Sequence, residues 1–318
     1  MKSAEEFAKF FETSLQVPLA ELEQKRKQIV FNIWISLLVA FGVLSLLSIF
    51  IGSAALIIFP IAALIVFLIV RFGFTKNYVQ EFKDKVIRSI VAFIDPSLNY
   101  RSDGFIPMDT FMSSEIFKVY PDRYNGDDFV SGIVGKTQVT FSELHAEYKT
   151  ETTDKDGHRQ EYWHTIFKGL LVIADFNKNF EGKTVVLPDT AERLFGGFGK
   201  MLQSWNLMRG QLIQLEDPEF EKLFAVYGDN QVEARYILST SLMKRIVDFK
   251  NKSGKQIYLS FVGSRIYVAI SYSKSLFEPR VFKTLLDIRP AQEYFTDLEL
   301  ALGVVDDLNL NTRIWSKQ

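Results

Sequence analysis

The side chains best suited to metal chemistry lie in one expected β-hairpin. His145 and His164 fall in two strand-like stretches, and the candidate carboxylates Glu143 and Glu147 stand two positions before and after His145. Two imidazoles and one carboxylate form a common transition-metal site. If Asp156-Gly157 is a two-residue turn, Lys149 lies opposite His164, whereas a longer loop with a shifted register places His145 there. The sequence does not fix the register. The alternative, which we favour, is a solvated sheet face whose polar side chains hold no ligand.

Two short motifs resemble ligand-binding loops but lack residues that those loops need. Gly135-Lys136-Thr137 matches the end of a phosphate-binding loop, yet Val130 stands where its first glycine belongs. The stretch 175–179 begins like a calcium loop, but Phe180 and Val186 replace the required glycine and glutamate. We therefore interpret both as ordinary turns next to strands.

Nucleophilic and acid–base sites are not indicated either. The chain has no cysteine, and no serine stands in a G-x-S-x-G elbow. The carboxylate pairs Asp127-Asp128 and Asp306-Asp307 are adjacent in sequence, which predicts solvated faces. We assign no catalytic residue, no cofactor-binding residue and no metal ligand, and we expect no cofactor.

Outside these strands, the most prominent feature of the sequence is one long uncharged run. Residues 29–70 contain no Lys, Arg, Asp, Glu or His. A single membrane span needs roughly 20 apolar residues, so this run predicts two spans, 33–51 and 54–70, joined at Gly52-Ser53. Pro60 is expected to kink the second span. A buried hairpin of a soluble protein and a re-entrant wedge are the alternatives.

Basic residues flank the run on both sides and predict its orientation: Lys25, Arg26, Lys27, Arg71 and Lys76. By the positive-inside rule, both termini are cytoplasmic in a multi-pass protein of the inner (plasma) membrane. Trp34 stands where an interfacial anchor is expected. Each basic residue beside an anionic leaflet contributes on the order of 1 kcal/mol to membrane binding, and a purely topological role is compatible with that.

The remaining segments predict an α+β fold. We expect an amphipathic N-terminal helix and lead-in over 1–28, the transmembrane hairpin over 29–70, a helical stalk over 71–96, and a cytoplasmic α+β domain over 97–318. Apolar residues at a spacing of four after Arg71 indicate that the second span continues into the stalk. Alternating stretches over 128–187 predict an antiparallel meander. Flanking helices are expected over 191–208, 241–250 and 290–308.

Composition limits the partners and the compartment. Lys and Arg total 37 against 38 Asp and Glu, a net charge of −1. No basic surplus for nucleic acid is present. The lack of cysteine fits a reducing compartment.

Three runs carry a resemblance: FKGLLVIADFNKNFEGKTVVLPD at 167–189, EDPEFEKLFAVYGDNQVEARYILS at 216–239, and SLFEP at 275–279. They are similar to an uncharacterised bacterial family of two-span membrane proteins with a large cytoplasmic domain, a domain of unknown function sometimes mislabelled as galanin. The resemblance covers residues 75–309, and the hairpin has the family's position too. It implies no activity and no site residue. A link with membrane proteins of the LemA type implies at most a partner.

We therefore expect a binding or scaffold module held at the inner face of the membrane. Its partners would be the lipid bilayer and other membrane or cytoplasmic proteins, and a homo-oligomer is compatible with the sequence. One alternative is an enzyme with an unrecognised, metal-dependent site around His145 and His164. Another is a hairpin that shapes the membrane.

Overall fold

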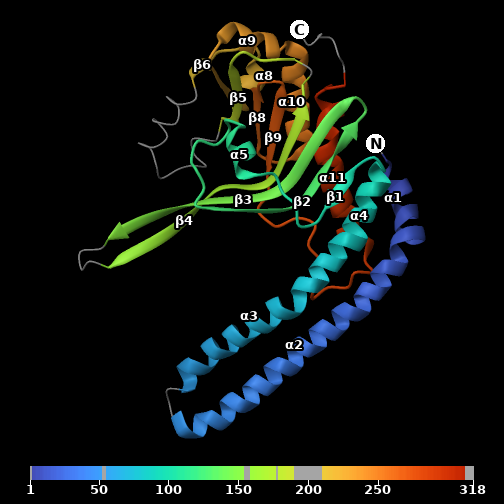
Figure 1. Cartoon of the computed structure of the whole chain (residues 1–318), viewed down its shortest axis with the longest axis vertical. Coiled ribbons are helices and arrows are strands. Elements are labelled where there is room, and N and C mark those ends of the chain that lie inside the picture. The colour runs from blue at the N-terminus through green and yellow to red at the C-terminus, as the bar shows by residue number, and fades with distance from the viewer. Residues whose placement is uncertain (1, 52–54, 154–157, 177, 190–209, 312–318) are drawn as a thin grey trace. The chain divides into compact units, whose positions relative to one another are not determined.

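The computed structural model describes residues 2–51, 55–153, 158–176, 178–189 and 210–311 (Figure 1). The chain divides into two compact units. The helical unit comprises residues 2–94 and 277–295, and the sheet unit comprises residues 95–276 and the chain from 296 onwards. The expected turns at Gly52-Ser53 and Asp156-Gly157 and the expected helix over 191–208 lie outside the described residues.

The helical unit begins with one nearly continuous helical path. It consists of α1 (Ala4–Phe10), the π-helical η1 (Phe11–Leu15) and α2 (Gln16–Ile51). Ser3 and Glu6 form a capping box, in which each side chain accepts a hydrogen bond from the other residue's backbone N–H. The return path is α3 (Ala55–Phe82), the π-helical η3 (Lys83–Ile87) and α4 (Arg88–Ile94). It ends just before Asp95-Pro96, because the residue before a proline disfavours the helical conformation.

Aromatic side chains pack together between α1, α4 and a late segment of the helical unit. The Phe7 ring stacks on Phe295 with centroids 4.4 Å apart, and Phe10 stacks on Phe93 at 4.2 Å. Phe295 belongs to α11 (Ile288–Asp307), a helix whose residues up to Phe295 group with the hairpin. Phe7 and Phe82 are almost fully buried. Offset aromatic contacts of this kind add to the free energy gained by burial alone.

The sheet unit is built on a nine-stranded antiparallel sheet in the order β1-β2-β3-β4-β9-β8-β5-β7-β6. The strands are β1 (Asn99–Arg101), β2 (Arg123–Val134), β3 (Thr137–Thr153), β4 (Arg159–Asp175), β5 (Lys183–Pro188), β6 (Gln211–Ile213), β7 (Phe224–Gly228), β8 (Ile257–Val262) and β9 (Arg265–Ser271). The α+β class and the antiparallel sheet are confirmed. The meander holds from β1 to β4 only, because β9 and β8 lie between β4 and β5.

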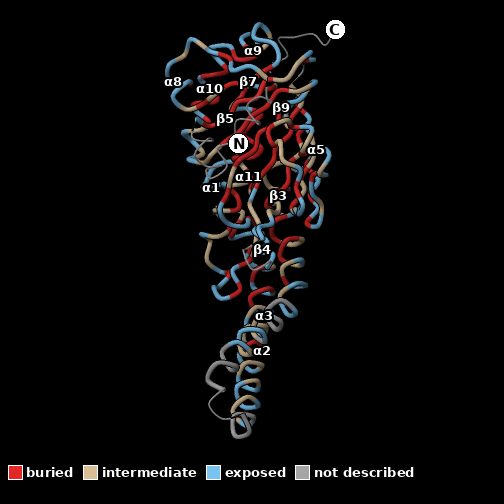
Figure 2. Tube along the Cα trace, turned by 90° about the vertical axis from the view of Figure 1, so that its left-hand side faces the viewer, coloured by how far each residue is buried: buried red, intermediate tan, exposed pale blue. Residues whose placement is uncertain are grey.

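Both faces of the central strands are covered. All residues from Ile266 to Ile270 of β9 are buried, and successive side chains of a strand point to opposite faces. One face packs around Phe111, Phe117 and Phe167, close to α5 (Met108–Met112). Figure 2 shows this burial as red strands in the sheet. The unit also contains α8 (Pro218–Glu221), α9 (Gln231–Ile237), α10 (Thr240–Ser253) and the second part of α11.

β3 and β4 extend beyond their neighbours in the sheet. The β2 pairing ends at Glu147 on β3, and the β9 pairing ends at Gly169 on β4. Among the described residues, the outer halves of the two strands therefore pair only with each other. Gly169 sits where the β4–β9 pairing ends, with φ +148°, and a Cβ atom there would lie 2.0 Å from the Ile270 carbonyl oxygen. This close approach of two backbones requires glycine.

We expect Gly169→Ala to lower the free energy of unfolding of the sheet unit by about 3 kcal/mol, because the backbone of β4 or β9 must move to admit the methyl group. Chemical denaturation followed by near-ultraviolet circular dichroism measures the change. Gly182→Ala is the matched control, since a Cβ there comes no closer than 3.3 Å, to the side chain of Glu233. Equal stability of the two variants would contradict the assigned β4–β9 contact.

Candidate functional site

The two histidines, which a longer loop would have placed opposite each other, do not pair. His164 pairs with Tyr148, and His145 pairs with Lys168. The pair expected from a two-residue turn, Lys149 with His164, is not observed, although both strands keep that register from Val139 to Ala146, where Ala146 pairs with Phe167. The last pair among the described residues of the ribbon is Thr153 with Arg159. In addition, the pairing shifts by one residue after Ala146, a β-bulge that sequence periodicity does not reveal.

Each histidine instead has a local partner. His145 Nε2 lies 3.6 Å from Glu147 Oε1, while His164 Nε2 lies 2.8 Å from Thr150 Oγ1 and its ring stacks on Tyr148. His145 and Tyr148 are three positions apart on β3, so their side chains lie on opposite faces of the ribbon. His164 therefore does not share a face with His145 and Glu147. Among the described residues, no histidine belongs to a group that is able to ligate a metal.

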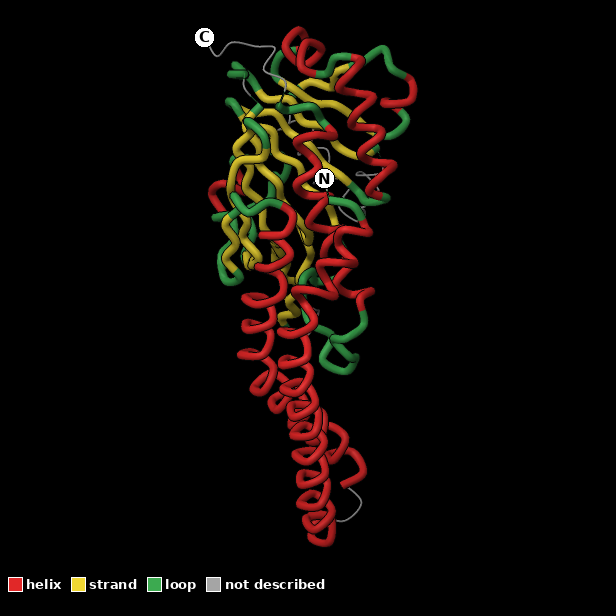
Figure 3. Tube along the Cα trace, turned by 90° about the vertical axis from the view of Figure 1, so that its right-hand side faces the viewer, coloured by secondary structure: helices red, strands yellow, loops and turns green. Residues whose placement is uncertain are grey.

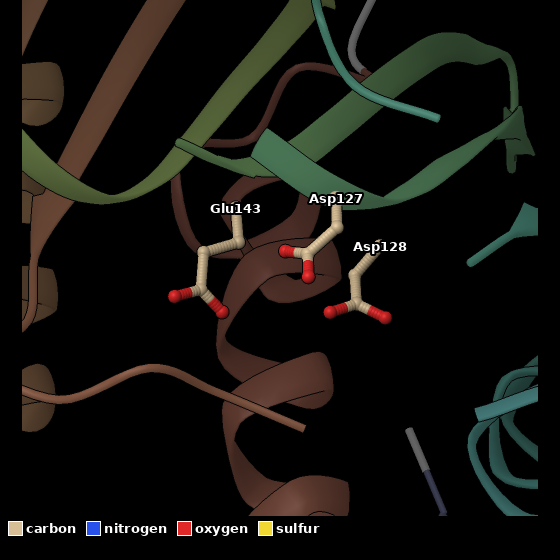
Figure 4. Close-up of side chains that lie close together, drawn as sticks. All are labelled: Asp127, Asp128 and Glu143. Carbon is tan, nitrogen blue, oxygen red and sulfur yellow. The ribbon is translucent and has the colours of Figure 1, made fainter. Parts of the chain in front are cut away.

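Three carboxylates that the sequence does not group together form a cluster instead. Asp127 and Asp128 of β2 and Glu143 of β3 offer oxygen atoms that lie within 4.8 Å of one another (Figure 4). Asp127 pairs directly with Glu143, and the register is then irregular up to Val130. Asp128 occupies this irregularity with φ +56°. Asp tolerates the left-handed conformation better than most residues.

Hydrogen-bond donors compensate the buried members of this acidic cluster. Asp128 is 1% exposed, and its carboxylate accepts from the Tyr100 hydroxyl. Glu143 is 6% exposed, and its Oε2 accepts from the Leu276 backbone N–H at 2.7 Å. The sequence-based expectation of a solvated face at Asp127-Asp128 is thus wrong for Asp128. Carboxylate oxygens suit a hard divalent cation, and in this cluster they also anchor the chain after β9.

Tyr100→Phe removes one donor from a buried carboxylate, so we expect the free energy of unfolding to fall by about 1–3 kcal/mol. Tyr120→Phe is the control, because Tyr120 is 59% exposed. Thermal unfolding of both variants checks the difference. A Tyr100→Phe variant as stable as the Tyr120→Phe variant would show that the Tyr100 hydroxyl does not support Asp128.

The basic residues expected beside the membrane separate into two groups. Lys25 bonds Glu81 across the hairpin at 2.7 Å, and Arg26 bonds Glu23 at 2.7 Å with both side chains largely buried. Lys27 and Lys76 are exposed and make no ion pair among the described residues. The side chain of Arg71 lies outside the described part. Lys25 and Arg26 thus bind carboxylates within the helical unit itself.

A buried polar contact joins α2 to the loop that precedes α11. Arg26 Nη1 donates to the Val281 carbonyl at 2.9 Å, and Glu23 Oε2 accepts from the Leu285 N–H at 3.0 Å. Lys83 of η3 bonds Glu278 at 2.9 Å. The hydrogen bonds from Arg26, together with that from Leu285, hold the pKa of Glu23 below its usual range, and Glu23 raises the pKa of Arg26.

Because the pKa of Glu23 is lowered in the folded protein, its contribution to stability is present above the ordinary pKa of about 4.3 and is lost as the pH falls below it. We expect Glu23→Gln to lower the free energy of unfolding of the helical unit by about 1–3 kcal/mol at neutral pH. The deficit should shrink as the pH falls through the folded-state pKa.

Unfolding in detergent, followed by circular dichroism at several pH values, measures this deficit. Glu12→Gln is the control, because Glu12 is exposed and makes no ion pair in the described chain. A deficit of Glu23→Gln that stays constant with pH would contradict the linkage.

The hairpin exposes a large apolar surface. On α2, Phe31, Trp34, Leu38 and Phe41 are all more than 60% exposed. The described residues contain one helix that is long and apolar enough to cross a membrane, Ala4–Leu46, and 6% of its most apolar stretch is buried. The core helix of a soluble protein is mostly buried. Figure 3 shows the two long helices of the hairpin, α2 and α3, running side by side.

The fold and these sites define an α+β protein whose sheet unit is joined to a long apolar helix. Residues 165–310 match the family described as "Protein of unknown function (DUF3137)". The expectation of an uncharacterised domain is confirmed over that range. No curated protein matches the chain.

One solved structure is similar, the crystal structure of the mycobacterial trehalose monomycolate transport factor A, TtfA. It has 10% sequence identity and a TM-score of 0.37, with 72% of this chain and 95% of that chain covered.

Proposed function

We propose that this protein is a binding or scaffold module held at the cytoplasmic face of the inner membrane by its helical hairpin. The observation that carries the proposal is the exposed apolar surface of α2. Four large side chains of one segment, from Phe31 to Phe41, are more than 60% exposed. Each gains roughly 1.5–3 kcal/mol when it leaves water. Such a surface requires a cover, and lipid is the occupant that fits its length.

The geometry of the helix supports a membrane span. From Ile29 to Ile51, α2 carries no charged residue. At about 1.5 Å per residue this segment reaches roughly 35 Å, enough to cross a hydrocarbon core of about 30 Å. A second span within α3 would return the chain to the starting side. The exposed Lys27 and Lys76 then lie next to the cytoplasmic leaflet, in accordance with the positive-inside rule.

A binding role is favoured over catalysis because the histidines lie apart and the acidic cluster is compensated by internal donors. In the described part of the chain, the sheet ends at β1 and β6, and the outer halves of β3 and β4 pair only with each other. Strand edges of this kind are suited to pairing with an extended segment of a partner protein.

The absence of cysteine permits a direct test of the topology. We expect a protein with Ser53→Cys to react with a membrane-impermeant maleimide in intact cells. Proteins with Ser14→Cys or Ser241→Cys, both exposed positions, should react only after the membrane is permeabilised. The protein should also stay in the membrane pellet after alkaline extraction.

Reaction of Ser53→Cys only after permeabilisation would indicate a wedge or a hairpin that does not cross. Release of the protein by alkaline extraction would contradict the membrane anchor itself.

A further inference from the structure

The loop between β9 and α11 carries two exposed apolar side chains beside the helical hairpin. Phe282 is 50% exposed and Leu286 is 52% exposed. The loop belongs to the helical unit, so its place beside α2 is defined. In Figure 1 it is the orange-red segment next to the two long helices.

The neighbours of these side chains in sequence fix the loop to the hairpin. Val281 and Leu285 are buried, and their backbone groups bond Arg26 and Glu23 respectively. A further bond joins the Lys283 N–H to the Arg280 carbonyl at 2.9 Å. Val281 and Leu285 are thus held inward while Phe282 and Leu286, one position later, face outward. The loop is held in shape before any partner binds.

The loop lies close to the start of the uncharged run. Its two backbone contacts are made by Glu23 and Arg26, and the run begins at Ile29. Arg26 and Ile29 are about 5 Å apart along the helix axis. The headgroup layer of a bilayer is roughly 5–8 Å thick on each side. A hairpin that is embedded from Ile29 onwards therefore brings the loop to the level of the headgroups.

The charges around the two apolar side chains favour an anionic surface. Arg280 is paired with Glu293 and Arg289 with Asp287, each within 2.7 Å, so these charges are compensated. Lys283 is exposed and makes no ion pair among the described residues.

Lys27 is also exposed and lies near enough to Glu23 to lower the pKa of that carboxyl. Apolar side chains flanked by exposed lysines are typical of segments that lie in a membrane interface.

We propose that residues 281–286 form a second, peripheral contact with lipid. Phe282 and Leu286 enter the interface between headgroups and acyl chains, and Lys27 and Lys283 contact anionic headgroups. The bilayer is the one that holds the hairpin, so this inference rests on the proposed function. The contact would fix the rotation of the hairpin about its own axis, because only one side of α2 carries the loop.

Lipid-depth quenching of a fluorophore tests the contact. The full chain is prepared with a single cysteine, Leu286→Cys, labelled with an environment-sensitive dye and reconstituted into vesicles of phosphatidylcholine and phosphatidylglycerol. We expect quenching by lipids that carry a nitroxide near the headgroup and weaker quenching by lipids that carry it deep in the chain.

Two matched positions make the outcome decisive. Leu38→Cys, on the exposed face of α2, should be quenched most by the deep nitroxide, and Ser14→Cys, an exposed position of η1 roughly 22 Å before Ile29 along the helical path, by neither. If Leu38→Cys is quenched and Leu286→Cys behaves like Ser14→Cys, the loop contact is overturned while the membrane anchor stands. If Leu38→Cys is not quenched, the anchor itself fails.

A charge variant separates the headgroup contact from general insertion. Lys283→Gln leaves the buried side chains of the loop unchanged. It should weaken docking of the loop about fivefold in vesicles with phosphatidylglycerol and have little effect in phosphatidylcholine alone. Full quenching of this variant in the anionic vesicles would overturn the role of Lys283.

Discussion

The apolar surface of the hairpin is the constraint on which the rest of the structure depends. A run without charge from residue 29 to 70 folds into helix wherever it is described, because its backbone groups are then satisfied internally. The large side chains of α2 stay exposed, so the protein itself does not cover them. Whatever covers this surface also holds the rest of the chain close to it. The location of the protein therefore follows from a local property of the sequence.

The helical unit is stabilised by polar contacts in the parts of its helices that lie outside the apolar run. Polar side chains there bind one another and the loop before α11, instead of remaining free for lipid. Glu23 is central, because it accepts from Arg26 on its own helix and from the backbone of Leu285. Contacts of the same kind link Lys25 to Glu81 and Lys83 to Glu278. A late segment of the chain thus becomes part of the helical unit.

Features that depend on local periodicity could be predicted from the sequence. The stalk helix, the end of α4 before Asp95-Pro96 and the antiparallel strands are of this kind. Features that depend on pairing between distant parts of the chain could not be predicted from the sequence. The insertion of β9 and β8 beside β4 has no local signal. The burial of Asp128 follows from an irregularity in the β2–β3 register and from a distant tyrosine, so its neighbours in sequence do not reveal it.

The basic residues that flank the uncharged run must likewise be judged by their contacts in the folded protein. The positive-inside rule counts Lys and Arg residues near the spans, yet Lys25 and Arg26 each have a carboxylate partner in the folded unit. A paired lysine presents little net charge to a leaflet. In the proposed topology, all of these residues contribute to the orientation of the hairpin before folding. After folding, Lys27 and Lys76 are the flank lysines that stay exposed without an ion pair among the described side chains, and they would attract anionic lipid. Orientation and lipid binding thus depend on overlapping but different sets of residues.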